Sequence, residues 1–243
     1  MEITGRIALV TGGAHRVGRA LSTALAEAGM RVAINYNSAS AEADALVRDL
    51  LARGHECRAY RSDLTHPDAP SSLIADVTRD LGGLDVLVNS AAVMRRTPVD
   101  DVSVTEWDDI FALNLRAPFF LSQAARPWLR KVNGCIVNLA DLAAFETWPE
   151  YIPHGISKAG IVQMTRAMAR AYAPEVRVNA IAPGAVLLPD DWSDATRAHF
   201  ASTTPLRRIG SPTDVVEALL YLLRADYVSG DTLMVDGGRH VRT

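Results

Sequence analysis

Short apolar runs alternate with longer segments of helical period along this chain of 243 residues. The runs are rich in Val, Ile and Leu, and they occupy residues 7–10, 31–36, 57–62, 84–89, 135–139, 176–182 and 232–235. Strands that are apolar along their whole length are typical of a parallel sheet with both faces covered by helices. The alternation therefore predicts an α/β fold with a seven-stranded, doubly wound parallel sheet. No linker-like or repeated segment interrupts it, so we expect one domain over residues 1–243.

One stretch stands apart from this pattern. Residues 186–205 have weak periodicity and mix Pro, Asp, Trp and Thr. Long irregular connections in compact domains often close over a binding site. We therefore expect a substrate lid in this stretch.

Composition and cysteine usage exclude several classes of protein. The hydrophobic share of 49% is that of a globular protein, and the net charge of −3 gives no reason to expect nucleic acid or an anionic membrane as a partner. Cys57 and Cys135 form no CxxC motif, so we expect reduced thiols and a cytoplasmic location. We see no signal peptide, and no apolar run reaches the roughly 18–20 residues of a membrane span. The expected partner is a small-molecule substrate.

A glycine-rich turn lies directly between the first apolar run and the first helical segment. Residues 11–18 read TGGAHRVG, and the helical period begins within them. Glycines let backbone approach a ligand closely, while the free N–H groups and the dipole of a helix N-terminus favour an anion. The turn therefore predicts a phosphate site in a Rossmann-like, nucleotide-binding fold; a purely structural turn is the alternative.

The same turn resembles the TGxxxGxG fingerprint of the short-chain dehydrogenase/reductase family. Gly12 and Gly18 match the fingerprint, whereas Arg16 replaces its middle glycine. The resemblance implies that these three residues and Val17 contact a nicotinamide cofactor. The Arg16 side chain would extend positive charge toward the cofactor phosphates or the substrate.

The end of the second predicted strand favours NADPH over NADH. NAD-binding proteins normally place an acidic residue there for the ribose 2′-hydroxyl, but residues 35–38 read NYNS. No carboxylate in this stretch would repel a 2′-phosphate, and Asn37 and Ser38 can donate hydrogen bonds to it. We therefore expect NADPH/NADP⁺ as the cofactor.

Further matches extend the family resemblance over almost the whole chain. They imply an adenine-contacting pair, a segment similar to the family's NNAG and a turn beside the nicotinamide. The cofactor-contacting residues expected from them are Asp63, Leu64, Asn89, Ala91, Pro183 and Gly184. Residues 208–212 and 235–238 resemble C-terminal landmarks of the family. The resemblance also implies a homotetramer, in which the helices around Asn114 and Lys158 and the C-terminal strands pair.

Asn114 lies on the inward face of a predicted helix that we expect Thr105 to cap. A buried Asn needs partners, and Pro118, four residues later, has no N–H to give to the Asn114 carbonyl. The freed oxygen can hold a water or a cation. The family uses the matching Asn to connect a catalytic Lys to a water chain; an Asn that merely tolerates a kink is the alternative.

The catalytic positions of the family carry two departures in this chain. Family members place a Ser after the fifth strand, and a Tyr and a Lys four residues apart on the next helix. Their Tyr donates a proton, and their Lys lowers the Tyr pKa and binds the nicotinamide ribose. Lys158 is present here, but His154 stands at the Tyr position and Asp141 at the Ser position.

Several features resemble the pteridine reductase branch of the family. Asp in place of the catalytic Ser is one, and the others are Arg16 and the segments 35–38, 173–179 and 236–240. The chain is most similar to bacterial pteridine and dihydromonapterin reductases on these grounds. Val93 departs from the branch, because its members often carry there an aromatic residue that stacks on the pterin.

The set of Asp141, His154 and Lys158 suits reduction of C=N better than reduction of C=O. Reducing a ketone requires protonation of a developing alkoxide, whereas hydride delivery alone converts an iminium to a neutral amine. An Asp at position 141 can stabilise the iminium cation as a carboxylate, or protonate an imine nitrogen when it carries a proton itself. We therefore expect an NADPH-dependent oxidoreductase acting on a pterin-like or cyclic imine substrate.

Two alternatives stay open. A carbonyl reductase would use His154 or Tyr151 as its acid. A catalytically silent nucleotide-binding homologue would have Asp141 as a turn residue and His154 as a surface residue. The His and acidic residues show no metal-ligand spacing, so we expect no metal site.

Overall fold

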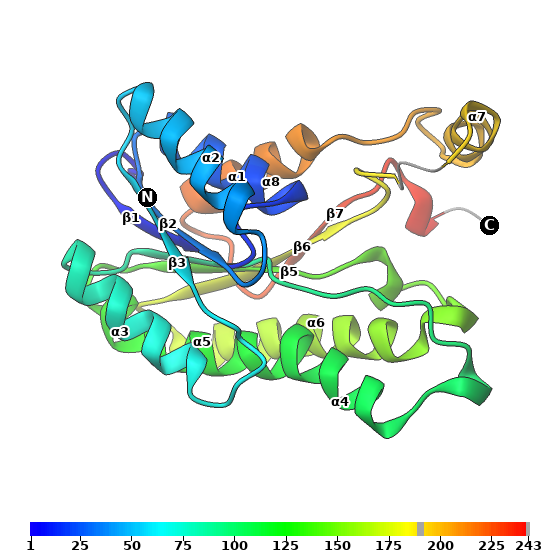
Figure 1. Cartoon of the computed structure of the whole chain (residues 1–243), viewed down its shortest axis with the longest axis horizontal. Coiled ribbons are helices and arrows are strands. Elements are labelled where there is room, and N and C mark those ends of the chain that lie inside the picture. The colour runs from blue at the N-terminus through cyan, green and yellow to red at the C-terminus, as the bar shows by residue number, and fades with distance from the viewer. Residues whose placement is uncertain (189–191, 242–243) are drawn as a thin grey trace.

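All seven strands predicted from the sequence form one parallel sheet in the computed structural model (Figure 1). The structure describes residues 1–188 and 192–241. The strands are β1 (Ile7–Val10), β2 (Arg31–Tyr36), β3 (Cys57–Arg61), β4 (Val86–Asn89), β5 (Cys135–Leu139), β6 (Arg177–Pro183) and β7 (Thr232–Val235). They lie in the order β3-β2-β1-β4-β5-β6-β7, with every neighbouring pair parallel. The predicted fold class is confirmed.

Two layers of helices cover the sheet, one on each face (Figure 1). One layer contains α1 (Arg16–Glu27), α2 (Ser40–Ala52) and α8 (Pro212–Arg224), and the other α3 (Ala69–Leu81), α5 (Ala117–Lys131) and α6 (Ile152–Tyr172). β1 shows why both faces need cover. Ala8 and Val10 belong to the core under the first layer, and Ile7 and Leu9 to the core under the second. Side chains alternate between the faces of a strand, so a strand buried on both faces is continuously apolar.

Shorter elements complete the chain. They are α4 (Val104–Phe111), α7 (Asp194–Thr203), a π-helical turn η2 (Ala112–Arg116), and the 3₁₀ turns η1 (Val99–Asp101), η3 (Leu142–Ala144), η4 (Pro149–Tyr151) and η5 (Arg239–Val241). Within the described ranges, no helix combines the length and apolar character needed to cross a bilayer.

The predicted cap of the helix before Asn114 is wrong by two residues. Ser103, not Thr105, accepts the N–H of Glu106, and the Glu106 carboxylate accepts the N–H of Ser103 in return. Both candidates are good capping residues, but only Ser103 has a Glu three positions later to complete the capping box. After α4 the helix widens into η2, which carries Asn114 and ends at Arg116, two residues before Pro118.

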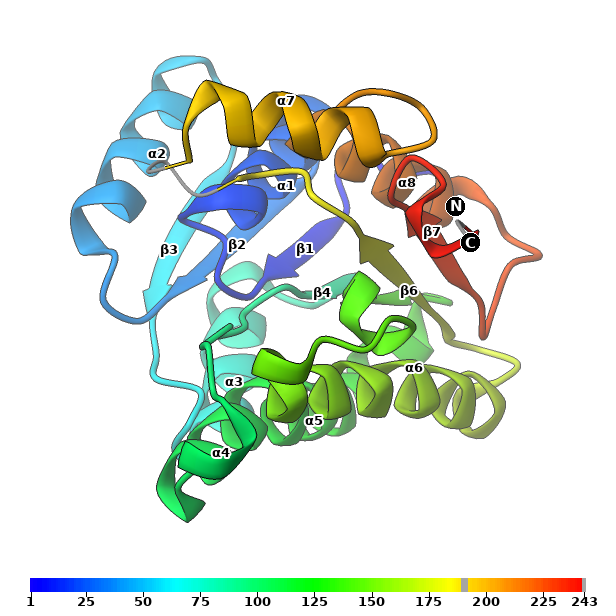
Figure 2. The same ribbon diagram turned by 90° about the vertical axis from the view of Figure 1, so that its right-hand side faces the viewer.

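The carboxyl ends of the strands share one edge of the sheet, where the strand order reverses between β1 and β4. Crevices at such a reversal are the usual ligand sites of open α/β sheets. Beyond the carboxyl ends of β6 and β7 lies α7, as Figure 2 shows. It forms half of the stretch 186–205 predicted to be a lid, of which residues 189–191 lie outside the described residues.

Candidate active site

The turn after β1 has the backbone of a phosphate-binding loop. Gly12 has a φ of +60°, and a Cβ on Gly18 would lie 2.1 Å from the Gly12 carbonyl oxygen, so only glycine fits there. Arg16 keeps a left-handed φ of +50°, the conformation that the middle glycine of the fingerprint adopts most easily. Its guanidinium donates to the carbonyl of Leu187 at 3.2 Å. Arg16 therefore combines a left-handed backbone with a side chain that reaches the Leu187 carbonyl.

Asn35 holds this turn against β2, a role that the sequence reasoning missed. Its Oδ1 accepts the N–H of Gly12 at 3.3 Å, and its backbone carbonyl accepts the N–H of Gly13 at 2.9 Å. Its Nδ2 donates to the carbonyl of Tyr60 at 3.3 Å. The available signal was an Asn inside an otherwise apolar strand, because a buried Asn needs partners.

The end of β4 packs directly against the same turn. Thr11 Oγ1 accepts the N–H groups of Ser90 and Ala91, each at 3.0 Å, and a Cβ on Gly12 would lie 3.0 Å from the Ala91 Cα. Asn89 instead points into the protein, where its Nδ2 donates to Asn138 Oδ1 at 2.8 Å. The Asn89 side chain therefore bonds to the protein interior behind the cavity wall, whereas Ala91 lines the cavity.

A cavity of about 1080 Å³ runs along the carboxyl edge of the sheet. It is lined by the predicted cofactor residues except Asn89, namely Gly12, Arg16, Val17, Gly18, Asn37, Ser38, Asp63, Leu64, Ala91, Pro183, Gly184 and Lys158. Glu42, on the first turn of α2, lines it too. Glu42 was not predicted at this end of the cavity, where the preference for NADPH was inferred from residues 35–38 alone.

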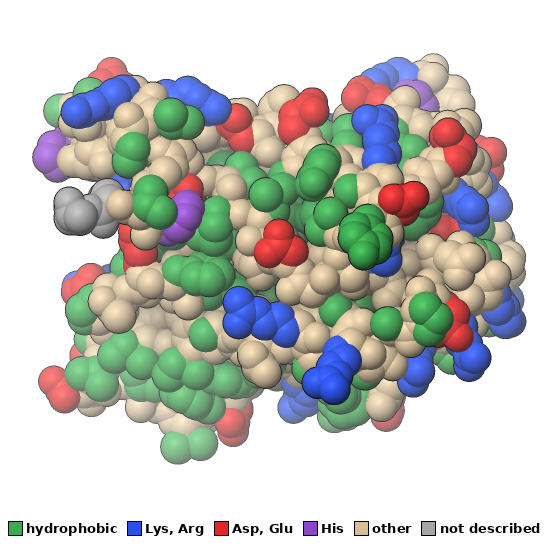
Figure 3. Space-filling model, turned by 180° about the vertical axis from the view of Figure 1, so that it is seen from behind, with side chains coloured by type: hydrophobic (Ala, Val, Ile, Leu, Met, Phe, Trp, Pro, Cys, Tyr) green, Lys and Arg blue, Asp and Glu red, His purple; other side chains and the backbone are tan. Residues whose placement is uncertain are grey.

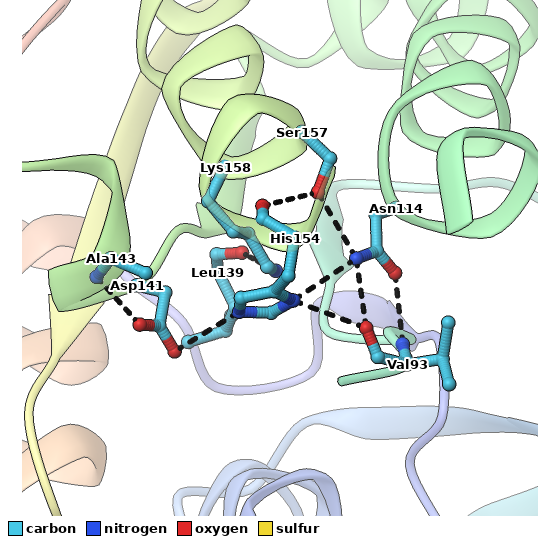
Figure 4. A network of polar contacts seen from close by, with 8 residues as sticks. All are labelled: Val93, Asn114, Leu139, Asp141, Ala143, His154, Ser157 and Lys158. Carbon is cyan, nitrogen blue, oxygen red and sulfur yellow. Dashed lines mark hydrogen bonds and ion pairs between the residues drawn. The ribbon is translucent and has the colours of Figure 1, made fainter. Parts of the chain in front are cut away.

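Asp141, His154 and Lys158 meet in this cavity, as predicted (Figure 4). Asp141 follows β5, and the other two lie one turn apart on α6. His154 Nε2 lies 3.7 Å from Asp141 Oδ2, and Lys158 Nζ donates to the Leu139 carbonyl at 2.7 Å. His154 is only 2% exposed, and its Nε2 has no hydrogen-bond partner among the described residues.

The neighbours of His154 Nδ1 decide which ring nitrogen carries a fixed hydrogen. Nδ1 lies 3.2 Å from the Val93 carbonyl oxygen, which only accepts. Its other neighbour, Asn114 Nδ2 at 3.4 Å, donates its two hydrogens to Val93 O and Ser157 Oγ. Nδ1 is therefore assigned the hydrogen and donates it to Val93. The atom left to exchange a proton with Asp141 or a substrate is Nε2.

Asn114 clamps the backbone segment that follows β4. Its Oδ1 accepts the Val93 N–H at 2.8 Å, and its Nδ2 donates to the Val93 carbonyl at 2.9 Å (Figure 4). The side chain is 1% exposed and does not line the cavity. Since the same carbonyl accepts from His154, Asn114 positions the imidazole through the backbone of Val93. This side-chain role was not among the interpretations of Asn114 that the sequence suggested.

Burial sets the charge state of Lys158. Its side chain is enclosed by protein, and this loss of solvent lowers its pKa to about 8, although the charge of Asp141 opposes the shift. Burial disfavours the charged form of an amine, which explains the direction. A carboxylate, an imidazole and an ammonium that is easily deprotonated therefore share one partly enclosed site.

Aromatic side chains line the remaining part of the cavity. They come from the β5–α6 connection and from the neighbourhood of α7, and they are Trp148, Tyr151, Trp192 and Phe200. In the part of the chain that the structure describes, no three His, Cys, Asp or Glu side chains are placed to hold a metal ion.

The site and the fold match a known family. A model described as enoyl-(acyl carrier protein) reductase covers residues 12–240. The chain is also 33% identical over 247 residues to 3-oxoacyl-(acyl-carrier-protein) reductase FabG of Staphylococcus aureus, with 99% of this chain and 100% of the relative covered. The chain belongs to the short-chain dehydrogenase/reductase family. A 3-oxoacyl-(acyl-carrier-protein) reductase of Synechocystis is 32% identical, with 97% of each chain covered.

Two solved structures with similar folds are described with a bound cofactor. One is a blue fluorescent protein from a metagenomic library in complex with NADPH, at a TM-score of 0.91, 30% identity and coverage of 98% of this chain and 99% of that one. The other is FolM alternative dihydrofolate reductase 1 from Brucella canis complexed with NADP. Its TM-score is 0.93 and its sequence identity 28%, with 100% of this chain and 96% of that one covered. The predicted family is confirmed, whereas the pteridine reductase branch stays a prediction, because the sequence relatives above are 3-oxoacyl reductases.

Proposed function

We propose that this protein is an NADPH-dependent reductase that acts on the C=N bond of a pterin-like or cyclic imine substrate. The observation that carries the proposal is the pair formed by His154 Nε2 and Asp141 Oδ2, 3.7 Å apart on the cavity wall. An imidazole with a facing carboxylate stands where the family resemblance implies a phenol and a hydroxyl. That exchange favours a substrate whose reacting atom is basic or cationic.

The cavity fits a dinucleotide phosphate cofactor. The glycine turn leaves no room for a Cβ at Gly18, and the N-terminus of α1 lies at the same place, as backbone recognition of phosphates requires. The phosphates would bind to Gly12, Arg16, Val17 and Gly18, the 2′-phosphate to Asn37 and Ser38, and the adenine to Asp63 and Leu64. The nicotinamide half would bind to Ala91, Lys158, Pro183 and Gly184, with Asn89 behind them and outside the cavity lining. When bound, NADPH supplies the hydride. The NADPH and NADP of the two solved structures support this choice of cofactor.

The protein's part in the reaction is to supply one proton and to stabilise one positive charge. When hydride adds to the carbon of C=N, the electron pair of the double bond moves to nitrogen. With a neutral imine, a protonated His154 donates a proton from Nε2 to that nitrogen, while Nδ1 stays bonded to Val93. With an iminium the nitrogen already carries its proton or alkyl group, so no proton is transferred. Asp141 stabilises the positive charge in either case, on the imidazolium or on the substrate. The Lys158 ammonium donates to the Leu139 carbonyl, and its positive charge lies near the negative charge of Asp141.

The test is NADPH oxidation with matched imines and ketones, such as 2-methyl-1-pyrroline and cyclopentanone, together with a dihydropterin. We expect turnover of an imine or the pterin, and His154→Gln should slow it by about 100-fold, the usual scale of general acid catalysis. His66→Gln, an exposed His outside the cavity, serves as the matched control and should retain full activity. Absence of turnover with every pterin and imine would refute the proposal.

Carbonyl reduction is the second candidate function, and the 3-oxoacyl reductases among the relatives favour it. His154 or Tyr151 would then protonate the oxygen. Ketone turnover that exceeds imine turnover in the same panel would select this candidate. Tight NADPH binding without turnover of any substrate would instead identify a catalytically silent homologue.

We also propose that the protein assembles as a homotetramer. Figure 3 shows hydrophobic side chains gathered over the region of α4. Val104, Trp107, Phe119 and Phe120, on α4 and α5, are all exposed. Clustered exposed aromatic residues mark protein contact surfaces, and the family resemblance implies pairing through these helices.

A further inference from the structure

The helix α7 has no buried residue, yet it supplies part of the cavity wall. Phe200 on α7 and Trp192, two residues before its start, both line the cavity, and their ring centroids lie 5.5 Å apart. Helices in proteins usually keep their place by burying an apolar face. Since α7 lacks such a face, individual side-chain contacts determine where these two rings lie.

The main contact of Phe200 comes from the C-terminal turn η5. Arg239 in this turn is only 8% exposed, and its Cζ atom lies 3.9 Å from the centroid of the Phe200 ring. The same guanidinium donates to Thr204 Oγ1 at 3.2 Å, and Thr204 Oγ1 donates in turn to the Phe200 carbonyl at 3.1 Å. The face of an aromatic ring attracts a guanidinium. Arg239 therefore holds both the ring of Phe200 and the last turn of α7.

Asp236 fixes the turn that presents Arg239. Its backbone carbonyl accepts the N–H of Arg239 at 3.4 Å, and its Oδ2 accepts the N–H of His240 at 2.7 Å. The same Oδ2 lies 2.8 Å from His240 Nδ1. A Cβ on Gly237 would lie 2.7 Å from Thr204 Cγ2, so the turn and the end of α7 are in direct contact. The guanidinium is thus presented to α7 from a fixed backbone.

We infer that Arg239 is a positioning residue for the substrate, which anchors α7 so that Phe200 and Trp192 form the cavity wall on which the substrate packs. Arg is almost never buried unless it is paired, and here the buried guanidinium stacks on a helix that is otherwise exposed. The inference rests on the proposed function for the identity of the substrate, whereas the anchoring of α7 is a property of the protein alone.

An anchor of this kind also lets α7 open. Elements with few buried apolar contacts open locally at a low free energy, while the rest of the fold stays intact. Arg239, Phe200 and Thr204 all lie beyond the carboxyl ends of β6 and β7, so their separation leaves the sheet untouched. Release of Arg239 from Phe200 would therefore open this wall of the cavity for substrate entry.

Hydrogen exchange tests the anchor without any substrate. In the protein saturated with NADP⁺, Arg239→Met should accelerate amide exchange in residues 194–203 by about tenfold, the scale of one desolvated cation–π contact. Exchange in β1 and β5 should stay unchanged, because the sheet does not depend on this contact. Phe200→Leu should give the same local acceleration, since it removes the ring from the other side. Arg239→Lys should keep most of the protection, because it retains a cation.

Arg126→Met is the matched control. Arg126 has its Cζ atom 4.7 Å from the centroid of the Tyr172 ring and donates to the Ala171 carbonyl at 3.3 Å, outside the cavity. The substitution removes the same kind of contact, and exchange in α7 should persist at its original rate. Unchanged exchange of α7 in Arg239→Met would overturn the inference, as would an equal acceleration of α7 in the two Met variants.

Steady-state kinetics tests whether the anchor serves the substrate. With the imine or pterin that is turned over, Arg239→Met should raise KM about tenfold and retain kcat, because Asp141 and His154 lie on other elements. Arg126→Met should keep both constants. An unchanged KM in Arg239→Met would refute the positioning role. Absence of turnover with every substrate would refute the proposed function instead, and the exchange of α7 would still decide whether Arg239 anchors this helix.

Discussion

Replacing Asn114 by Ala tests whether this side chain positions the catalytic imidazole. The substitution removes hydrogen bonds to the Val93 N–H, the Val93 carbonyl and Ser157 Oγ, at 2.8, 2.9 and 3.1 Å. The Val93 N–H loses its acceptor in a partly buried place, so the free energy of unfolding should fall by about 1–3 kcal/mol. The Val93 carbonyl, which accepts from His154 Nδ1, is no longer held by Asn114, and kcat should fall by about 10- to 100-fold, within the range of general acid catalysis. The KM for NADPH should stay unchanged, since Asn114 does not line the cavity.

Asn179→Ala provides the control, because Asn179 is a buried clamp of the same kind elsewhere. Its Nδ2 donates to the Val228 carbonyl at 2.8 Å, and its Oδ1 accepts the Asp231 N–H at 3.1 Å, just before β7 begins at the amino edge of the sheet. We expect a similar loss of stability in thermal unfolding, with kcat retained. Equal losses of kcat in the two variants, or full turnover in Asn114→Ala, would refute the positioning role.

Three further predictions concern charge and assembly. Because burial lowers the pKa of Lys158 to about 8, its ammonium is present below that pH, and kcat/KM should fall as pH rises through about 8. Lys158→Met should be slower throughout and lack this alkaline fall in pH–rate profiles, and an unchanged fall would assign it to another group. Asn37→Asp should raise the KM for NADPH by about tenfold or more and leave that for NADH little changed, since a carboxylate repels a 2′-phosphate; equal effects on both cofactors would contradict this. Phe119→Asp should shift the protein to smaller species in sedimentation equilibrium, and an unchanged mass would exclude its helix from the subunit contact.

The strands were predictable because a strand that is buried on both faces consists of apolar residues, and this pattern can be seen in the sequence of the strand alone. β1 is buried on both faces, and every residue of it is apolar. α7 was not predictable by the same means, since none of its residues is buried and its ring contact, Trp192 on Phe200 at 5.5 Å, joins it to a residue outside the helix. A helical period in a sequence arises when one face of the helix is buried, and α7 has no buried face.

The candidate site was predictable where side chains follow directly from strand ends and helical spacing. Asp141 follows β5, and the four-residue spacing of His154 and Lys158 places both on one face of α6. Trp148 was not predicted as a residue of the cavity wall, because an irregular connection has no period from which the direction of a side chain can be inferred. Its place in the connection between β5 and α6, close to Asp141 in the sequence, is the signal that could have revealed it.

Electrostatics connects the two departures from the family's catalytic residues. A unit charge about 4 Å from the Asp141 carboxylate interacts with it by about 4 kcal/mol at an effective dielectric of about 20, before further screening of a side chain that is 26% exposed. The sign of that energy depends on the substrate, because an iminium is attracted and an alkoxide developing at the same place is repelled. A Tyr-to-His exchange alone replaces a phenol donor by an imidazolium, which is the stronger acid. Asp141 places a negative charge beside that donor, which favours a cationic substrate over a developing alkoxide. This electrostatic preference supports the proposed reduction of a C=N bond over the second candidate, reduction of a ketone.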